Sequence, residues 1–486
     1  MSLPIWTSAS HQAAQTPPQR NRYVDLLRAA SICLVILGHW LVAAIYAQGN
    51  HMETQDVIAV IPWTRWLTWL FQVMPVFFLV GGYVNALGWQ SARRRRENYT
   101  AWLARRLQRL VLPVLPVLAA WTLIGAFFAG LFHQISFPTS LLKNASQFAL
   151  LPAWFLVVYI LMILLTPLSY RAWQRYGFYS FWAPVAAAAL IDLLALGVGW
   201  HILGWLNYLF VWLAVHQLGY AWQAGRIGAP RRALLWAAAG LAVLIALVAF
   251  GPYPINMVTT ASQRISNSLP PRVTLVALGV AQTGLLLALE KPARRLLQRG
   301  ALWTATVLIN GIIMTVFLWH VTALVTAVGL IFIIGGWERF FLLSILPGTS
   351  TWWLTRPLWI AILIVVLIPF VALFHRFERL GQARPSPASP TPAPPASPTP
   401  APPTPAPPTP ASPTPASPTP APPAPAPPAW QLLSDCALVC LGLSILTLRG
   451  IPTQTWPGIN LLALALPFLG AALIWFTPKR TSPPDD

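Results

Sequence analysis

Residues 22–39 read Arg-Tyr-Val-Asp-Leu-Leu-Arg-Ala-Ala-Ser-Ile-Cys-Leu-Val-Ile-Leu-Gly-His, and the apolar run that they open continues to about residue 46. A helix of about 20 residues crosses the ~30 Å hydrocarbon core of a bilayer. Asp25, Arg28 and His39 lie within this run. Ionisable side chains are costly at membrane depth, and they usually serve a function there. The stretch therefore predicts a membrane-spanning helix that carries reactive groups.

The composition of the whole chain agrees with a membrane protein. Hydrophobic residues make up 56% of the 486 residues and charged residues only 9%, with a mean hydropathy of +0.62. A soluble globular domain carries about 25% charged residues, so this chain could not cover its surface with solvated groups. The net charge of +20 does not indicate a nucleic-acid partner, because the cytoplasmic loops of membrane proteins collect Lys and Arg.

Apolar runs long enough to span a bilayer recur along the chain. Twelve of them lie near residues 24–46, 67–89, 110–132, 149–169, 180–199, 203–222, 233–251, 273–289, 304–332, 353–374, 430–447 and 458–476. The run at 304–332 is overlong, and we expect it to tilt or break. The pattern predicts an all-α polytopic membrane protein.

The distribution of cations predicts the orientation in the membrane. With the N-terminus in the cytoplasm, 24 of the 31 Lys and Arg residues fall on the cytoplasmic side. Positive charge near span ends resists translocation. We therefore predict that both termini are cytoplasmic.

A change of composition divides the chain. Residues 385–429 are almost only Pro, Ala, Thr and Ser and hold 23 of the 49 prolines, so this segment cannot form a core and should be an extended linker. We predict a polar N-terminal tail at 1–22, a ten-helix domain at 23–384, the disordered linker at 385–429, and a two-helix hairpin with a short tail at 430–486.

Helical spacing aligns the ionisable groups of the first span. At about 100° per residue, Arg28 and His39 lie about 20° apart around the helix, and His39 lies roughly 16 Å further along it. Asp25 is about 40° from the same line, and it is close enough in sequence to pair with Arg28. A deep imidazole in line with a guanidinium and a carboxylate suits proton transfer. Interfacial anchoring of Arg28 and a structural hydrogen bond for His39 are the alternatives.

The spacing of Arg28 and His39, with ten residues between them, resembles the membrane-bound acyltransferase-3 family of integral-membrane O-acyltransferases. Further similar segments follow in the same order as in that family: Phe77-Phe78-Leu-Val-Gly81-Gly82-Tyr83, Arg105-Arg106-Leu-Gln-Arg109 with Pro113, Trp154-Phe155-Leu156 and Leu318-Trp319-His320. Gly81 stands where the family usually has serine.

The resemblance implies an enzyme that takes an acyl group, acetyl above all, from cytoplasmic acyl-CoA. The acceptor would be a hydroxyl of an extracytoplasmic or membrane-associated glycan or glycolipid. It also implies a multi-pass protein of the bacterial cytoplasmic membrane. Acyl-CoA would be a co-substrate, and we expect no permanently bound cofactor and no metal.

Site residues follow from the resemblance and from their chemistry. We expect Asp25, Arg28, His39 and His320 to be catalytic, with His39 as general base or transient acyl carrier. Arg106 and Arg109 lie on one helix face and could grip the CoA phosphates, or they could be topology charges. Gly81 and Gly82 would give the pantetheine arm room, or would serve close helix packing.

Two other functional classes compete with acyl transfer. A transporter or flippase would suit twelve spans, although we find no convincing internal repeat. A scaffold organised by the Pro-rich linker would leave the alignment of Asp25, Arg28 and His39 unexplained. Because every matching segment precedes Arg384, we expect the chemistry to lie in the ten-helix domain.

Overall fold

The computed structural model describes residues 4–17, 20–48, 51–131, 139–260, 263–335, 340–381, 428–452 and 459–476. Almost all of this is helix, and two short strands form a small sheet. The predicted linker lies outside the described residues, except for its last two. In chain order the elements are α1 (Pro4–Ala14), α2 (Arg22–Val42), β1 (Ala43–Gln48), β2 (His51–Asp56), α3 (Val57–Val60), α4 (Thr64–Phe71), α5 (Met74–Arg94), α6 (Tyr99–Val111), η1 (Leu112–Val114), α7 (Leu115–Leu131), α8 (Thr139–Ala149), α9 (Ala153–Tyr176), α10 (Tyr179–Asp192), η2 (Leu193–Gly197), η3 (His201–Leu206), α11 (Asn207–Gln223), α12 (Pro230–Phe250), α13 (Val273–Ala288), α14 (Glu290–Leu296), α15 (Gly300–Gly335), α16 (Phe341–Ser344), α17 (Ser350–Gly381), α18 (Ala429–Arg449) and α19 (Leu461–Phe476).

The helices confirm an all-α polytopic membrane fold. Ten helical stretches of the described chain are long and apolar enough to cross a membrane. The pair α13 and α14 makes one more candidate, bent by 52°, and the apolar helix α19 has 16 residues. Each of the twelve apolar runs contains a helix. The orientation with both termini in the cytoplasm stays a prediction.

The first span ends earlier than the apolar run suggests. Helix α2 stops at Val42, and the chain continues as a β-hairpin in which Ala43 pairs with Asp56 and Gln48 with His51. Pairing in a hairpin satisfies backbone groups that the helix has left free. The hairpin thus begins one helical turn beyond His39.

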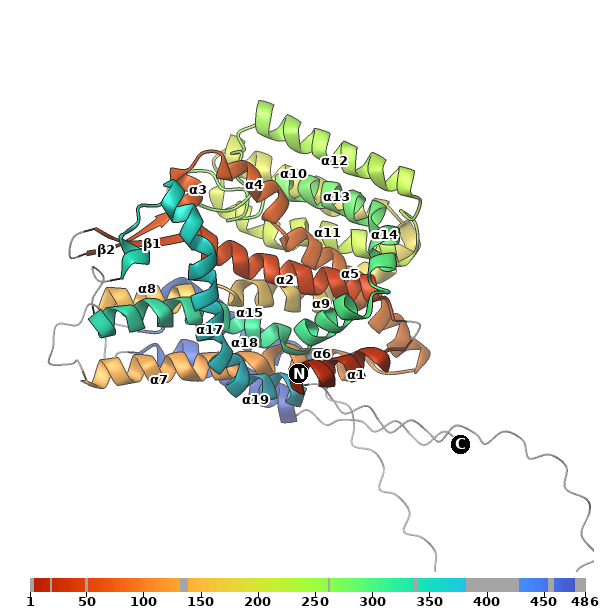
Figure 1. Ribbon diagram of the computed structural model, residues 1–486. Helices are drawn as coiled ribbons and strands as arrows, with labels where there is room; N and C mark the ends of the chain where they lie inside the picture. The colour runs from red at the N-terminus through yellow and green to blue at the C-terminus, as the bar shows by residue number, and fades with distance from the viewer. Residues whose placement is uncertain are drawn as a thin grey trace, which may run out of the picture.

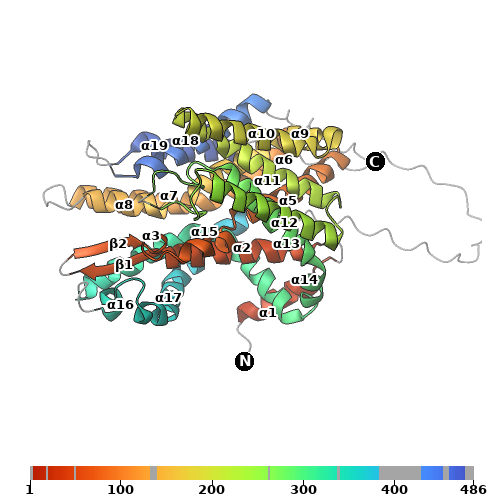
Figure 2. The same ribbon diagram turned by 90° about the horizontal axis from the view of Figure 1, so that it is seen from above.

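The long helices run roughly parallel, with α12 at one edge of the bundle and α7 and α19 at the opposite edge (Figure 1). Helix α17 crosses the others at a steep angle, and it contains Pro357 and Pro369. The β1–β2 hairpin lies at one end of the bundle, and α1 and α14 lie toward the other (Figure 2).

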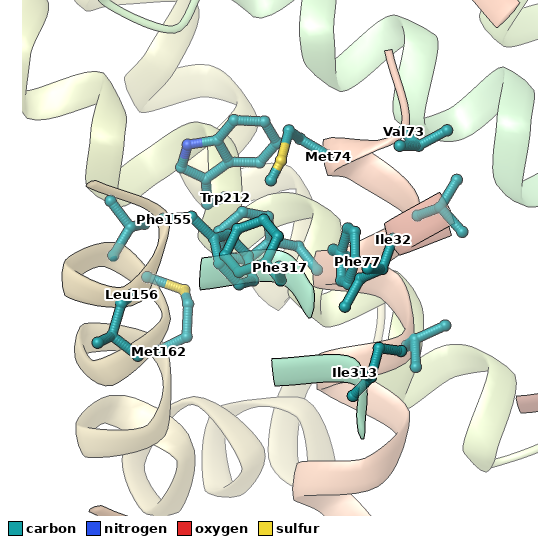
Figure 3. Close-up of a cluster of buried hydrophobic side chains, with 14 of the residues drawn as sticks. Ile32, Val73, Met74, Phe77, Phe155, Leu156, Met162, Trp212, Ile313 and Phe317 are labelled. Atoms are coloured by element: carbon teal, nitrogen blue, oxygen red, sulfur yellow. The ribbon is translucent and has the colours of Figure 1, made fainter. Parts of the chain in front are cut away.

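Aromatic side chains fill the middle of the bundle. Phe77, Phe155, Trp212 and Phe317 come from α5, α9, α11 and α15 and meet in one buried cluster (Figure 3). The rings of Phe155 and Phe317 lie 5.8 Å apart at a steep angle, an arrangement that aromatic quadrupoles favour. This cluster packs directly against His320, because the ring of Phe317 lies 6.0 Å from that of His320.

Glycines permit a close crossing of α5 and α11. A Cβ atom at Gly82 of α5 would collide with the carbonyl oxygen of His216 on α11, and one at Gly219 would collide with the carbonyl oxygen of Leu79. The hydrophobic effect does not drive helices together within lipid, so close backbone contact supplies much of the packing energy. The crossing of α5 and α11 therefore depends on the absence of side chains at these two positions.

We expect Gly82→Ala to lower the thermal stability of the purified protein by an amount equivalent to about 2 kcal/mol or more, because the two helices must separate. Gly329→Ala is the matched control, since no atom lies within 4 Å of the added methyl group. Thermal unfolding in detergent measures both variants. Equal stability of the two variants would show that the stability of the protein does not depend on the close crossing of α5 and α11.

Candidate active site

Two histidines from distant parts of the chain meet inside the bundle. Nδ1 of His39 on α2 lies 2.8 Å from Nε2 of His320 on α15, and the two ring planes differ by only 5°. The indole nitrogen of Trp40 donates to the backbone oxygen of His320 at 3.0 Å. The structure thus brings together the two histidines that the sequence singled out.

The hydrogen bonds fix where the protons are on the neutral pair. Nδ1 of His320 lies 2.6 Å from the carbonyl oxygen of Phe317, which can only accept, so this nitrogen carries a hydrogen. Nε2 of His320 then has a lone pair and accepts from Nδ1 of His39. A neutral imidazole carries one hydrogen. Nε2 of His39 is therefore left with a free lone pair.

The two histidines differ in their access to the surroundings. His320 is completely buried, whereas His39 is half-buried. Gly38 precedes His39, and no other part of the described chain lies within 4 Å of the position that a Cβ would take there. The free nitrogen thus belongs to the less buried of the two rings, and the fully buried ring holds it in orientation. In this geometry His320 orients the ring of His39.

Arg28 is exposed on α2 and forms no ion pair with any acid of the described residues. Asp25, which the sequence places within reach of Arg28, instead pairs with Arg20 through two contacts of 2.6 and 3.1 Å. This bond raises the pKa of Arg20 above its ordinary value. Asp25 therefore holds the segment that precedes α2, and it does not pair with Arg28.

A buried carboxylate lies close to Arg28. Glu378 of α17 accepts from the backbone nitrogens of Met314 and Thr315 at 3.3 and 3.0 Å and from the Thr315 hydroxyl at 2.8 Å. Arg28 is near enough to interact electrostatically with Glu378. These bonds tie α17 to α15 about one and a half turns before His320. Glu378 thus links the position of His320 to that of Arg28.

Arg106 reaches into the bundle from α6. Its guanidinium donates to Asn85 Oδ1 at 2.8 Å and to the Val84 carbonyl at 3.3 Å, and it lies 5.4 Å from the ring centre of Trp102. A Cβ atom at Gly88 would collide with it, so this glycine makes room for the guanidinium. Arg106 is therefore held by protein groups on several sides.

The amide of Asn85 is itself held in orientation. Its Nδ2 donates to Nε2 of His216 at 3.1 Å, and both side chains are completely buried. The amide oxygen must then face Arg106. The result is a polar chain from α11 through α5 to α6, which fixes the guanidinium of Arg106 within the apolar bundle.

Arg109 differs from Arg106 in its surroundings. It is exposed, and none of the described carboxylates lies within 4.0 Å of it. Arg28, Arg105 and Arg109 all interact electrostatically with Arg106. Several cations therefore gather at one end of the site, and two of them, Arg28 and Arg109, form no ion pair with a described acid. Such a group suits a polyanion.

The structure shows the packing contacts of Gly81 and Gly82. Gly82 lies against the backbone of α11, as described above, and a Cβ at Gly81 would lie 2.7 Å from the ring of Tyr159. Of the two roles that the sequence left open for these glycines, helix packing is the one whose contacts are present. A contribution to pantetheine binding stays a prediction.

A cavity of about 490 Å³ lies between α9, α10 and α11. Apolar residues line most of it, and none of the candidate site residues is among them. We therefore do not place the reaction there. The described residues also contain no group of three His, Cys, Asp or Glu side chains that could hold a metal ion.

Sequence reasoning missed three members of this site. Glu378 lies beyond residue 374, where the apolar run ends, although α17 continues to Gly381. The only available signal was an isolated acid close to a span end. Asn85 and His216 are polar residues within apolar runs, which by itself indicates a function, but nothing in the sequence shows that they touch.

Comparison with known families identifies the chain. A family model described as an acyltransferase domain matches residues 21–376, which is more than half of the chain. No curated protein and no solved structure matches significantly. The matched region contains both histidines, Arg28, Arg106 and Arg109, the residues whose geometry is described above. This chain belongs to the acyltransferase-3 family of membrane proteins.

Proposed function

We propose that this enzyme transfers an acyl group, acetyl above all, from cytoplasmic acyl-CoA to a hydroxyl of an extracytoplasmic or membrane-associated glycan or glycolipid. The observation that carries this proposal is the hydrogen-bonded pair His39–His320, which leaves Nε2 of His39 free. Membership of the family supports acyl transfer over the transport alternative. The identity of the acyl donor and acceptor is part of the proposal.

The cations at one end of the site would bind the phosphates of CoA. Arg28 and Arg109 are exposed and form no ion pair with a described acid, so their guanidinium groups can form charge-assisted hydrogen bonds. The ~16 Å rise along α2 from Arg28 to His39 is the distance that the pantetheine arm has to cover. Phosphate binding at Arg28 thus directs the thioester toward His39.

The free nitrogen of His39 would activate the acceptor. Nε2 takes the proton of the acceptor hydroxyl as its oxygen forms a bond to the thioester carbonyl carbon. The carbon–sulfur bond then breaks, and the CoA sulfur receives the proton from His39. As positive charge develops on His39, Nδ1 keeps its bond to His320. A transient acyl group on Nε2 is the alternative use of the same atom.

An assay of the purified protein in vesicles tests the proposal. Radiolabelled acetyl-CoA is supplied, and free CoA and label on candidate glycans and glycolipids are measured. We expect CoA release that depends on acceptor and label that becomes bound to the acceptor hydroxyl. Absence of both from well-folded protein, with any candidate acyl-CoA or acceptor, would contradict the proposal.

Replacement of His39 tests the catalytic role directly. We expect His39→Gln, which keeps hydrogen bonding but lacks basicity, to lower kcat by about 10²–10⁴ because a general base is lost. Binding of CoA, measured by calorimetry, should be unchanged. The control His201→Gln alters an exposed histidine outside the site. Near-normal turnover of His39→Gln would make His39 structural.

The two arginines of α6 should respond differently to replacement. Arg109→Ala should raise KM for acyl-CoA at least tenfold, because charge-assisted contacts contribute about 1.5–3 kcal/mol, and it should leave thermal stability unchanged. Arg106→Ala should raise KM and also lower stability, because it leaves Asn85 without its partner. Arg93→Ala is the control. An unchanged KM in both α6 variants would indicate that these arginines only help to set the orientation of the protein in the membrane.

A further inference from the structure

The C-terminal helices α18 and α19 pack onto the ten-helix domain. One stripe of α18 has at most 1% of its surface exposed, and its members recur every three or four residues: Leu432, Cys436, Val439, Leu443 and Leu446. This spacing defines one face of a helix. Helix α18 contacts α6, α8 and α9, and α19 contacts α6 and α7, so the buried face of α18 is covered by these helices together with α19.

Polar contacts fix the hairpin at both of its ends. At one end, Gln147 of α8 donates to the carbonyl of Leu448 at 2.6 Å, and the Ile451 nitrogen donates to Ser146 at 3.2 Å. At the other end, Gln108 of α6 donates to the carbonyl of Ile474 at 3.0 Å. Ile474 lies in the last turn of α19, where carbonyl groups lack helical partners. Gln108 thus caps α19.

The contact of Gln108 occurs within the arginine-rich segment Arg105–Arg109 of α6. Gln108 lies between Arg106 and Arg109 in sequence, and it points about 200° around the helix from Arg106. Arg106 bonds to α5 on one side, and Gln108 bonds to α19 on the nearly opposite side. Helix α6 is therefore held between α5 of its own domain and α19 of the hairpin.

The contact between α6 and α19 is closely packed. Gln108 is 8% exposed and Ile474 is 1% exposed. A hollow between the two helices, lined by Gln108 and Ile474 among others, has a volume of about 10 Å³, at the lower limit for a single water molecule. A lost hydrogen bond here could not be replaced easily by water. This bond is thus one of the contacts that hold α6, together with its packing against α9, α17 and α18.

We propose that the C-terminal hairpin is a positioning element of the donor site, which acts through Gln108 to hold Arg106 and Arg109 where acyl-CoA binds. The inference rests on the proposed function and extends it to a part of the chain beyond the matched family region, which ends at residue 376. The Pro-rich linker then serves only as a covalent connection, because the docked surfaces themselves hold the hairpin.

Two glutamine variants of the full-length enzyme test this role. Gln108→Ala removes the bond next to the arginines, and Gln147→Ala removes a bond of the same chemistry to the far end of the hairpin. We expect Gln108→Ala to raise KM for acetyl-CoA about threefold to tenfold, the range of one lost hydrogen bond. Its kcat should stay within twofold. Gln147→Ala should change both constants less than twofold.

The KM and kcat values separate positioning from general destabilisation. An unchanged KM in Gln108→Ala, or an equal rise in Gln147→Ala, would overturn the inference. If Gln108→Ala does not fold, Gln108→Asn keeps the amide but shortens its reach, and the same rise in KM is expected. Absence of turnover in the wild-type enzyme would instead overturn the proposed function, and this inference with it.

Cleavage of the linker gives an independent test. A protease site inserted between residues 385 and 427 allows the folded, full-length enzyme to be cut after purification. We expect the hairpin to remain bound and KM for acetyl-CoA to stay within twofold, because the docked surfaces are intact. Co-purification after cleavage measures retention. Release of the hairpin, or a rise in KM while it stays bound, would contradict docking as the source of the effect.

Discussion

The hydrogen bond between His39 and His320 joins α2 to α15, and the rest of the candidate site is arranged around it. The backbone of Phe317 orients His320, and His320 orients His39. Three further hydrogen bonds, which the Glu378 carboxylate accepts, anchor the preceding turns of α15 to α17. Because a buried hydrogen bond is costly to leave unmade, these contacts favour one arrangement of the three helices. The free nitrogen of His39 is a consequence of that arrangement.

The cationic end of the site depends on a second set of contacts, centred on α6. Burial of a guanidinium in an apolar bundle is costly unless its donors are satisfied. Arg106 meets this requirement through Asn85 and Val84, with His216 behind the amide. Arg109 and Arg28 are left without a described acid partner. Protein groups hold Arg106 in place, which stabilises the charged cluster. Arg28 and Arg109 would then be available to the anionic ligand that we propose.

Much of the fold followed from the sequence, because hydropathy and the need for internal hydrogen bonding determine helical spans. Contacts between distant segments did not follow. Asp25 pairs with Arg20 rather than Arg28, and Gln108 meets a backbone carbonyl more than 300 residues away. Glu378 was missed because hydropathy places the end of a span before its first charges, although the helix itself continues.

The protonation of His39 is the most direct test of this account. Full-length protein with ¹⁵N-labelled histidine, in lipid and near neutral pH, gives imidazole nitrogen signals by solid-state NMR, and comparison with His39→Gln assigns those of His39. We predict that Nδ1 carries the hydrogen and that Nε2 shows the signal of an unprotonated nitrogen. A hydrogen on Nε2, with Nδ1 unprotonated, would contradict the proton arrangement on which the proposed chemistry depends.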